Sequence, residues 1–231
     1  MTTDRQMPES EGQTNRPAEA LRQRLAAHPW TASCYQRFAP ELSFGRHRGP
    51  AGPDARPAAV VVLFYPSNGH WHLPLILRPA SMSAHASQIS LPGGGAEPGE
   101  AAEACALREL HEELGVDPAR VRMLGALPPI YVYASNFFVR PFVALASERP
   151  PFRPDPREVA ELLELPLPHL MDQRNYETHA IVRGHLSFEA PCITFQGRNI
   201  WGATALILGE LLDVISDREP DNLFTRGGSK K

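Results

Sequence analysis

Runs of apolar residues predict the strands of a sheet. Residues 58–65 (AAVVVLFY) are rich in β-branched and aromatic side chains, which is typical of a buried strand. Residues 71–78 (WHLPLILR) form a second run, and the four residues between the two runs, PSNG, have turn chemistry, so we expect a β-hairpin. Further strands are expected at residues 121–127, 138–145 and 159–165, followed by a late hairpin from 178–185 and 191–195 that turns at Gly184 or Glu189.

Helical patterns surround these strands. Residues 18–27 (AEALRQRLAA) form a short amphipathic pattern, and residues 200–215 (IWGATALILGELLDVI) are apolar almost throughout, which predicts a closing helix. A third helix is expected over residues 100–114, followed by Gly115 where a left-handed C-terminal cap favours glycine. Strands and helices in this order favour an α/β fold with one mixed sheet between helices.

The two ends of the chain are polar. Residues 1–17 are expected to form a disordered N-terminal tail and residues 217–231 a polar C-terminal tail, because neither can bury an apolar core. Residues 18–216 are long enough for a single domain with one good core.

Composition narrows the class of protein. A hydrophobic content of 42% is ordinary for a globular chain, and a net charge of −3 gives no reason to expect nucleic-acid binding. The start has no apolar signal region and no run approaches 18 apolar residues, so no membrane segment is expected and a reducing cytoplasm is the expected compartment. Oligomeric state stays open, with a homodimer as one option. Three cysteines without a CxxC spacing argue against a disulfide framework or zinc site: Cys34, Cys105 and Cys192.

The helix over residues 100–114 has an unusual acidic face. At about 100° per residue, its leucines form one apolar face, and Glu109, Glu112 and Glu113 fall together on the opposite face. Like charges at these spacings repel by about 0.2–0.5 kcal/mol per pair, and the helix dipole disfavours anions in the last turns. The face is either a solvated polar surface or a site for a hard divalent cation, which prefers clustered carboxylate oxygens.

Fixed spacings around this helix favour the cation site over the solvated surface. Gly94 is followed after five residues by Glu100, after seven more by Arg-Glu-Leu (108–110), then by the Glu112-Glu113 pair and by Gly-Val (115–116). This pattern resembles the Nudix box at every fixed position. The resemblance implies a Nudix α/β/α sandwich and a hydrolase that uses Mg²⁺ or Mn²⁺ to cleave a small-molecule nucleoside-diphosphate substrate.

The resemblance also implies roles for individual residues. Glu109 and Glu113 would be the principal metal ligands, with Glu112 as third ligand or base. The Gly94 carbonyl would add a ligand. Arg108, a partner for either Glu100 or Glu112, would orient a carboxylate, with Glu100 as the expected bidentate partner. Glu158 lies in a later segment that resembles the same family, where it would supply a ligand or a base; the choice of base between Glu112 and Glu158 stays open, and an exposed charge is the alternative for Glu158.

A second motif precedes the box. The stretch from residue 77 to residue 94 resembles the signature of the coenzyme A diphosphatase branch of the family, and two more segments, 152–167 and 200–205, resemble later parts of that branch. Ser83 stands where the branch usually has a second arginine, and Ser87 where it usually has glycine. The alternative for the motif is an irregular strand before the glycine turn. The matching residues, taken as substrate-binding, are Arg78, His85 and Gln88.

Two further segments have side chains suited to a nucleotide. In residues 129–137, Tyr131, Tyr133 and Phe137 would stack an adenine or close over a pantetheine arm, or else pack as core and rim. In the basic loop at residues 45–57, Arg46 and Arg48 would either reach a substrate phosphate or belong to a solvated connector.

Three functions are consistent with these patterns. The preferred one is hydrolysis of coenzyme A or an acyl derivative to 3′,5′-ADP and (acyl-)4′-phosphopantetheine, as the resemblance implies. Hydrolysis of ADP-ribose, NADH or another capped nucleotide is the alternative, because of Ser83 and Ser87. The third is a non-catalytic module that senses a nucleotide; the complete set of Arg108 and the box glutamates argues against it.

The serine at position 83 yields a test. We expect Ser83→Arg to raise coenzyme A affinity, because it restores a guanidinium suited to bidentate phosphate contact. Calorimetric titration of the wild-type protein and the variant measures the change. Equal affinities would show that position 83 does not contact the phosphates.

Overall fold

Alternation of side chains along one strand sets the two-sided architecture. A computed structural model describes residues 9–28, 36–40, 46–80, 87–183 and 186–216. Within strand β1 (Arg56–Ser67), successive buried side chains enter two different apolar clusters. Because strand side chains point alternately to opposite faces, a strand buried on both sides needs cover on both sides. The residues facing one cluster are Ala59, Val61, Leu63 and Tyr65, and those facing the other are Ala58, Val62 and Phe64.

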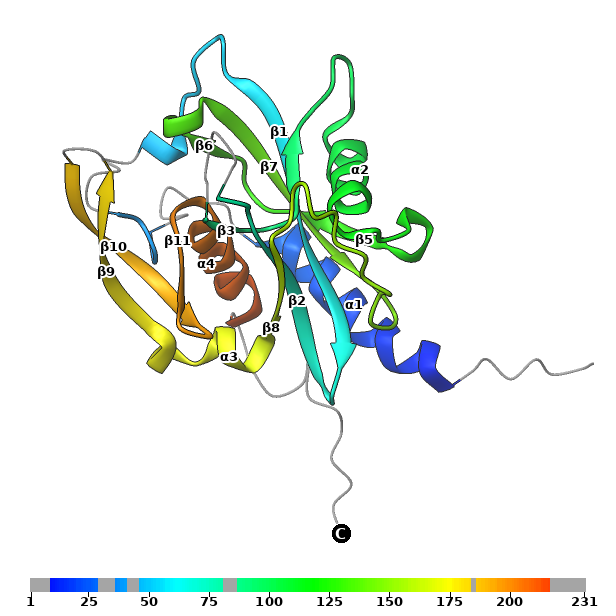
Figure 1. Cartoon of the computed structure of the whole chain (residues 1–231). Coiled ribbons are helices and arrows are strands. Elements are labelled where there is room, and N and C mark those ends of the chain that lie inside the picture. Colours follow the sequence, from blue (N-terminus) through cyan, green and yellow to red (C-terminus); the bar gives the residue numbers. More distant parts are fainter. Residues whose placement is uncertain (1–8, 29–35, 41–45, 81–86, 184–185, 217–231) are drawn as a thin grey trace, which may run out of the picture.

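Strands β1 and β7 (Phe137–Leu145) form the centre of the main sheet and run parallel, whereas the other pairs in this sheet are antiparallel. In the described part of the chain this sheet has eight strands, in the order β3-β2-β1-β7-β5 with β4, β6 and β8 paired to its members, and a second sheet has the order β11-β10-β9 (Figure 1). The remaining bounds are β2 (His70–Leu77), β3 (Ile89–Ser90), β4 (Gly93–Gly95), β5 (Arg122–Ala126), β6 (Ile130–Val132), β8 (Glu161–Pro166), β9 (Tyr176–Arg183), β10 (Leu186–Phe195) and β11 (Arg198–Trp201).

Helices cover both faces of the main sheet, as Figure 1 shows. Helix α2 (Ala102–Leu114) buries Leu110 and Leu114 in one cluster, whereas α1 (Glu9–Ala27) and α4 (Gly202–Ser216) contribute to the other. This arrangement confirms the expected α/β/α sandwich. The shorter helices are α3 (Leu167–Met171) and the 3₁₀ turns η2 (Arg46–Arg48), η3 (Pro118–Arg120), η4 (Tyr133–Ser135) and η5 (Gln173–Asn175). None of the helices in the described ranges is long and apolar enough to cross a membrane.

The predicted hairpins are present. Strands β1 and β2 pair in register Tyr65↔His72, with positive φ angles of 47° at Asn68 and 82° at Gly69 in the turn between them. In the late hairpin, Arg183 of β9 pairs with Leu186 of β10, which agrees with the Gly184 alternative. The Glu189 alternative is wrong, because Glu189 pairs with Ala180 inside the ladder.

Two predicted boundaries are wrong. Helix α1 begins at Glu9 and not at Ala18, so residues 9–17 do not form the expected disordered tail; their polar sequence lacks the apolar periodicity from which a helix is predicted. The tail residues 1–8 and 217–231 lie outside the described ranges. The closing helix begins at Gly202, after β11 has taken up Ile200 and Trp201. Gly202 has a φ of 64°, a left-handed conformation that lets the chain turn from strand to helix.

The glycine turn of β4 leads to a stability prediction. Gly93 has a φ of +151°, and a Cβ there would lie 2.3 Å from the Ala59 carbonyl oxygen and 2.6 Å from the Val60 Cα. Because the obstruction is strand backbone, we expect Gly93→Ala to lower the free energy of unfolding by ~3 kcal/mol or more in urea titrations.

Gly99→Ala is the matched control for this prediction. Gly99 also has a positive φ, of +80°, but an added Cβ would have no neighbour within 4 Å. The decrease in the free energy of unfolding of Gly99→Ala should reflect backbone strain alone, about 1–2 kcal/mol. Equal losses for the two variants would show that the approach of β4 to β1 does not require glycine at position 93.

Candidate metal and substrate site

The glycine turn brings the sheet against the acidic helix. Strand β4 pairs with β1 in register Ala59↔Gly94, which places the turn over the middle of α2. A Cβ on Gly94 would lie 2.5 Å from the carboxylate carbon and from both carboxylate oxygens of Glu109. Glycine at position 94 therefore leaves the space in which the Glu109 carboxylate lies.

Three carboxylates converge beside this turn. Ligand oxygens of Glu109, Glu113 and Glu158 all lie within 4.8 Å of one another. Glu109 and Glu113 are one helical turn apart on α2, as the sequence predicts. Glu158 comes from the loop before β8, which is more than forty residues further along the chain.

Backbone hydrogen bonds explain how the distant loop reaches the helix. The Arg153 amide donates to the Leu114 carbonyl at 2.8 Å, and the Asp155 amide donates to the Glu113 carbonyl at 2.9 Å. Both carbonyls belong to the last turn of the helix, where carbonyl groups find no hydrogen-bond donor within the helix itself. The Glu158 amide then donates to the Asp155 carbonyl at 3.0 Å. The loop thus satisfies the C-terminal end of α2 and positions the third carboxylate with it.

Glu113 is a buried acid. Glu113 is 0% exposed. Its Oε2 accepts a 2.8 Å hydrogen bond from the Gly93 amide, and Nη1 of Arg78 lies 3.6 Å from its Oε1. Burial raises the pKa of Glu113 to about 8, with the Glu109 charge adding to the rise and the Gly93 and Arg78 interactions opposing it. Burial also raises the pKa of Glu109, against the effect of its hydrogen bond with Arg108. The sequence placed Glu113 on a face opposite the leucines, but its side chain lies against the sheet.

These groups fit a hard divalent cation. Oε1 of Glu113 is buried and has no hydrogen-bond partner among the residues that the structure describes, so it retains an unused acceptor. Three carboxylates close together in a partly buried site repel one another, and a cation would favour their charged forms. Mg²⁺ and Mn²⁺ prefer such oxygen donors.

Arg108 connects the remaining glutamates of the box. The expected bidentate pair with Glu100 is present, with Nε and Nη2 donating at 2.8 and 3.0 Å, and this pairing lowers the pKa of Glu100 to about 2. Nη1 donates to Glu109 at 2.9 Å and to Glu112 at 2.8 Å. Nη2 also donates to the Gly95 carbonyl at 3.1 Å, so one guanidinium connects the helix to the glycine turn.

Glu112 is not part of the carboxylate group. Its side chain is 50% exposed and pairs with Arg108, whereas Glu158 occupies the third position beside Glu109 and Glu113. The Gly94 carbonyl, expected as a ligand, lies 3.6 Å from the Cys105 Sγ, which is a buried free thiol.

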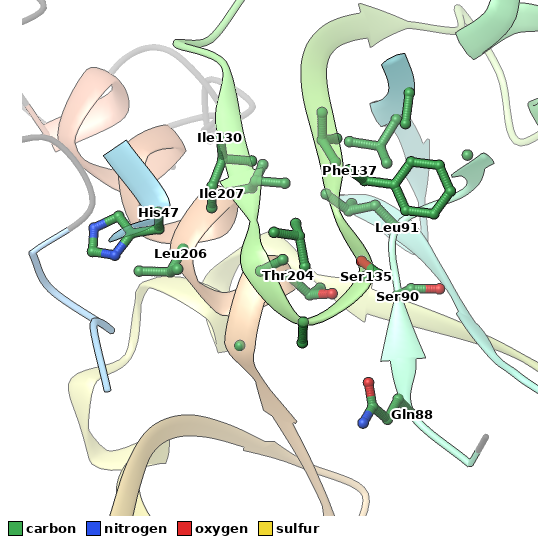
Figure 2. A pocket seen from close by; sticks show the side chains of 18 of the residues that line it. His47, Gln88, Ser90, Leu91, Ile130, Ser135, Phe137, Thr204, Leu206 and Ile207 are labelled. Atoms are coloured by element: carbon green, nitrogen blue, oxygen red, sulfur yellow. The ribbon is translucent and has the colours of Figure 1, made fainter. Parts of the chain in front are cut away.

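A cavity of about 790 Å³ extends from the carboxylates between the main sheet and α4. Its walls are mostly apolar, and Figure 2 shows Ile130, Leu206 and Ile207 around it together with the polar groups of His47 and Gln88. The sequence-predicted residues that line it are Gly94, Glu109, Glu113, Glu158, Arg46, Arg78, Gln88, Tyr131, Tyr133 and Phe137. Glu100, Arg108 and Glu112 do not line it, and His85, Ser83 and the Arg48 side chain fall outside what the structure describes.

The aromatic segment also lines this cavity. Tyr131 lies in β6 and Tyr133 in η4, their rings 6.3 Å apart edge to face, and Phe137 begins β7. Sequence reasoning missed Phe188 of β10, which lines the cavity next to Trp201. Phe188 belongs to no recognisable motif, and only the pairing of β10 with its neighbours brings it to the site.

The chain is similar to known proteins in sequence and in structure. A family model described as NUDIX domain matches residues 55–182. The sequence is 37% identical over 145 residues to an uncharacterized Nudix hydrolase NudL from Pectobacterium atrosepticum, which covers 62% of this chain and 75% of the relative. An uncharacterized Nudix hydrolase NudL from Yersinia pestis is 31% identical over 155 residues, which cover 62% of this chain and 77% of the relative. A crystal structure of a Nudix hydrolase from M. smegmatis, RenU, aligns with a TM-score of 0.49 at 20% identity over 71% of this chain and 88% of the other.

The geometry of the carboxylates leads to a binding prediction. We expect Glu113→Gln and Glu158→Gln each to weaken Mn²⁺ binding at least about tenfold in calorimetric titrations, because each removes a converging oxygen charge. Glu112→Gln should cause a clearly smaller loss, because that side chain contacts Arg108 outside the group. A loss for Glu112→Gln as large as for Glu158→Gln would contradict the assignment of the third ligand.

Proposed function

The chain belongs to the Nudix hydrolase family and hydrolyses pyrophosphate bonds, and we propose that the bond it cleaves is the diphosphate of coenzyme A or an acyl-coenzyme A. The products would be 3′,5′-ADP and 4′-phosphopantetheine or its acyl derivative. The observation that carries this proposal is one cavity lined by the carboxylates, by Arg78 and Gln88 of the second motif, and by a long apolar wall.

The apolar wall supports a substrate with an extended, weakly polar arm. Residues of the sheet and of α4 form the apolar part of the cavity wall, among them Val60, Val139 and Leu206. Burying an apolar arm against such a surface is favourable by roughly 25 cal/mol per Å². A pantetheine or acyl chain offers that surface, whereas ADP-ribose offers a second hydroxylated sugar. The complete box also supports an enzyme over a non-catalytic sensor.

Each group of the site has a role in this proposal. Glu109, Glu113 and Glu158 would hold Mg²⁺ or Mn²⁺, which when bound would neutralise diphosphate charge and acidify water. Arg78, beside Glu113, would donate to a diphosphate oxygen. Arg108 would hold the Glu109 carboxylate in place through its own pairing with Glu100.

The structure supports Glu158 over Glu112 as the base. Glu158 lines the cavity, whereas Glu112 lies outside it and is paired with Arg108. In this role one carboxylate oxygen of Glu158 would take the proton of the attacking water, which leaves its other oxygen for the cation, while the water oxygen bonds to phosphorus and the bridging oxygen leaves. A positioned base contributes roughly 10²–10⁴-fold to the rate.

A second candidate substrate class follows from the second motif. Ser83 and Ser87 stand where the coenzyme A diphosphatase branch has arginine and glycine, which weakens the match to coenzyme A. ADP-ribose, NADH or another capped nucleotide therefore remains the alternative substrate.

A substrate panel tests the proposal. The purified full-length chain is incubated with Mg²⁺ or Mn²⁺ and coenzyme A, acetyl-coenzyme A, ADP-ribose, NADH or a dinucleoside polyphosphate, and products are followed by chromatography. We expect the highest kcat/KM for coenzyme A or its acyl derivative and a loss of ~100-fold or more in Glu113→Gln.

Glu103→Gln is the matched control, because Glu103 is an exposed glutamate in the first turn of the same helix and does not line the cavity. It should keep wild-type turnover. A higher kcat/KM for ADP-ribose than for coenzyme A would overturn the proposed substrate.

A further inference from the structure

The cavity carries a second arginine, remote in sequence from the box. Arg46 in η2 lines the cavity, and its guanidinium carbon lies 4.6 Å from the centre of the Tyr133 ring. Tyr133 also lines the cavity and is 62% exposed, which is exceptional for an aromatic side chain in this chain's described part. An exposed aromatic ring with a guanidinium over it is a surface suited to an anionic, planar ligand.

A network of hydrogen bonds holds this surface in position. The Tyr131 hydroxyl donates to Asn136 Oδ1 at 2.8 Å, while the Tyr131 ring packs edge-on against Tyr133. The Asn136 amide nitrogen donates to the backbone oxygen of Asp54 at 3.1 Å and to its carboxylate at 3.2 Å. The segment before β1 and the tip between β6 and β7 are therefore fixed to one another, and η2 packs against β6.

The two cavity arginines occupy different places. Arg78 lies 3.6 Å from Glu113 and belongs with the carboxylates, where the diphosphate would be cleaved. Arg46 lies over Tyr133, which is not part of the carboxylate group. Arg46 and Arg78 are the arginines among the described residues that line the cavity. The cavity therefore offers cations at two separate points.

Coenzyme A carries anions at two separate points as well. Its diphosphate is joined through a ribose to a phosphate on the 3′ oxygen, and adenine is attached to the same ribose. A guanidinium over an aromatic ring directs its N–H donors along the ring face, which leaves its fork geometry suited to phosphate oxygens.

We propose that Arg46, positioned by Tyr133, binds the 3′-phosphate of the substrate ribose and so selects 3′-phosphorylated nucleotides over those that lack this group. This inference rests on the proposed function, because it names the recognition of the nucleotide half of that substrate. It assigns nucleotide selection to a segment that precedes β1 and shares no motif with the box.

The experiment compares coenzyme A with 3′-dephospho-coenzyme A, which differ only in that phosphate. We expect the wild-type protein to show at least about tenfold higher kcat/KM for coenzyme A, the scale of a hydrogen bond to a charged group. Arg46→Gln should reduce this ratio to about one, mainly through KM for coenzyme A. Arg46→Lys, which keeps the charge but not the fork, should give an intermediate ratio.

Arg56→Gln is the matched control. The Arg56 guanidinium carbon also lies over an aromatic ring, 4.0 Å from the centre of Phe137, but Arg56 does not line the cavity. It should keep the wild-type substrate ratio. An unchanged ratio in Arg46→Gln, or an equal loss on both substrates, would overturn the assignment, and thermal melting of each variant excludes misfolding as the cause.

A binding measurement separates this inference from the proposed function. The affinities of the wild-type protein and Arg46→Gln for 3′,5′-ADP and for 5′-ADP are measured by calorimetry, which requires no turnover. If coenzyme A is not hydrolysed, the proposed function fails, yet a preference for 3′,5′-ADP that Arg46→Gln abolishes would still support the phosphate site. The absence of that preference in the wild-type protein would refute it.

Discussion

Burial of the Glu113 carboxylate is the constraint on which the site depends. A carboxylate taken out of water is unfavourable by several kcal/mol unless donors or charges compensate it. Here the compensation comes from the Gly93 amide in β4 and from Arg78, which directly follows β2. The amide can reach the acid only because β4 approaches β1 and α2 without a side chain at position 93. The glycine turn, the sheet and helix α2 therefore all pack around the Glu113 side chain.

Arg108 offsets the repulsion among the acidic side chains of α2. The box places several acids within a few turns, and their repulsion would destabilise an isolated helix. One guanidinium pairs with Glu100, Glu109 and Glu112, and of these three acids only Glu109 also belongs to the group of converging carboxylates. A pattern of acids that is unfavourable for helix stability is therefore held in place by one arginine, beside the group of carboxylates for which we propose a cation.

The sequence predicted what depends on local spacing. Helix α2, the β1–β2 hairpin and the adjacency of Glu109 and Glu113 follow from periodicity and turn chemistry. The position of Glu158 could not be derived in this way, because it depends on hydrogen bonds between a distant loop and the end of α2. Strands β6 and β11 have three and four residues, too few for a periodic signal, and they exist through pairing with neighbours. The burial of Glu113 likewise depends on the glycine turn, which a helical wheel does not contain.

The loop that supplies Glu158 also terminates the helix that supplies Glu113. Its amides bind the Glu113 and Leu114 carbonyls, so loss of the last helical turn would release the loop, and loss of the loop would expose the helix end. Local opening would then remove both carboxylates together and would not leave a partial site with two acids held at the wrong separation. Within the native ensemble, the proposed cation site would then form or be lost as one cooperative unit.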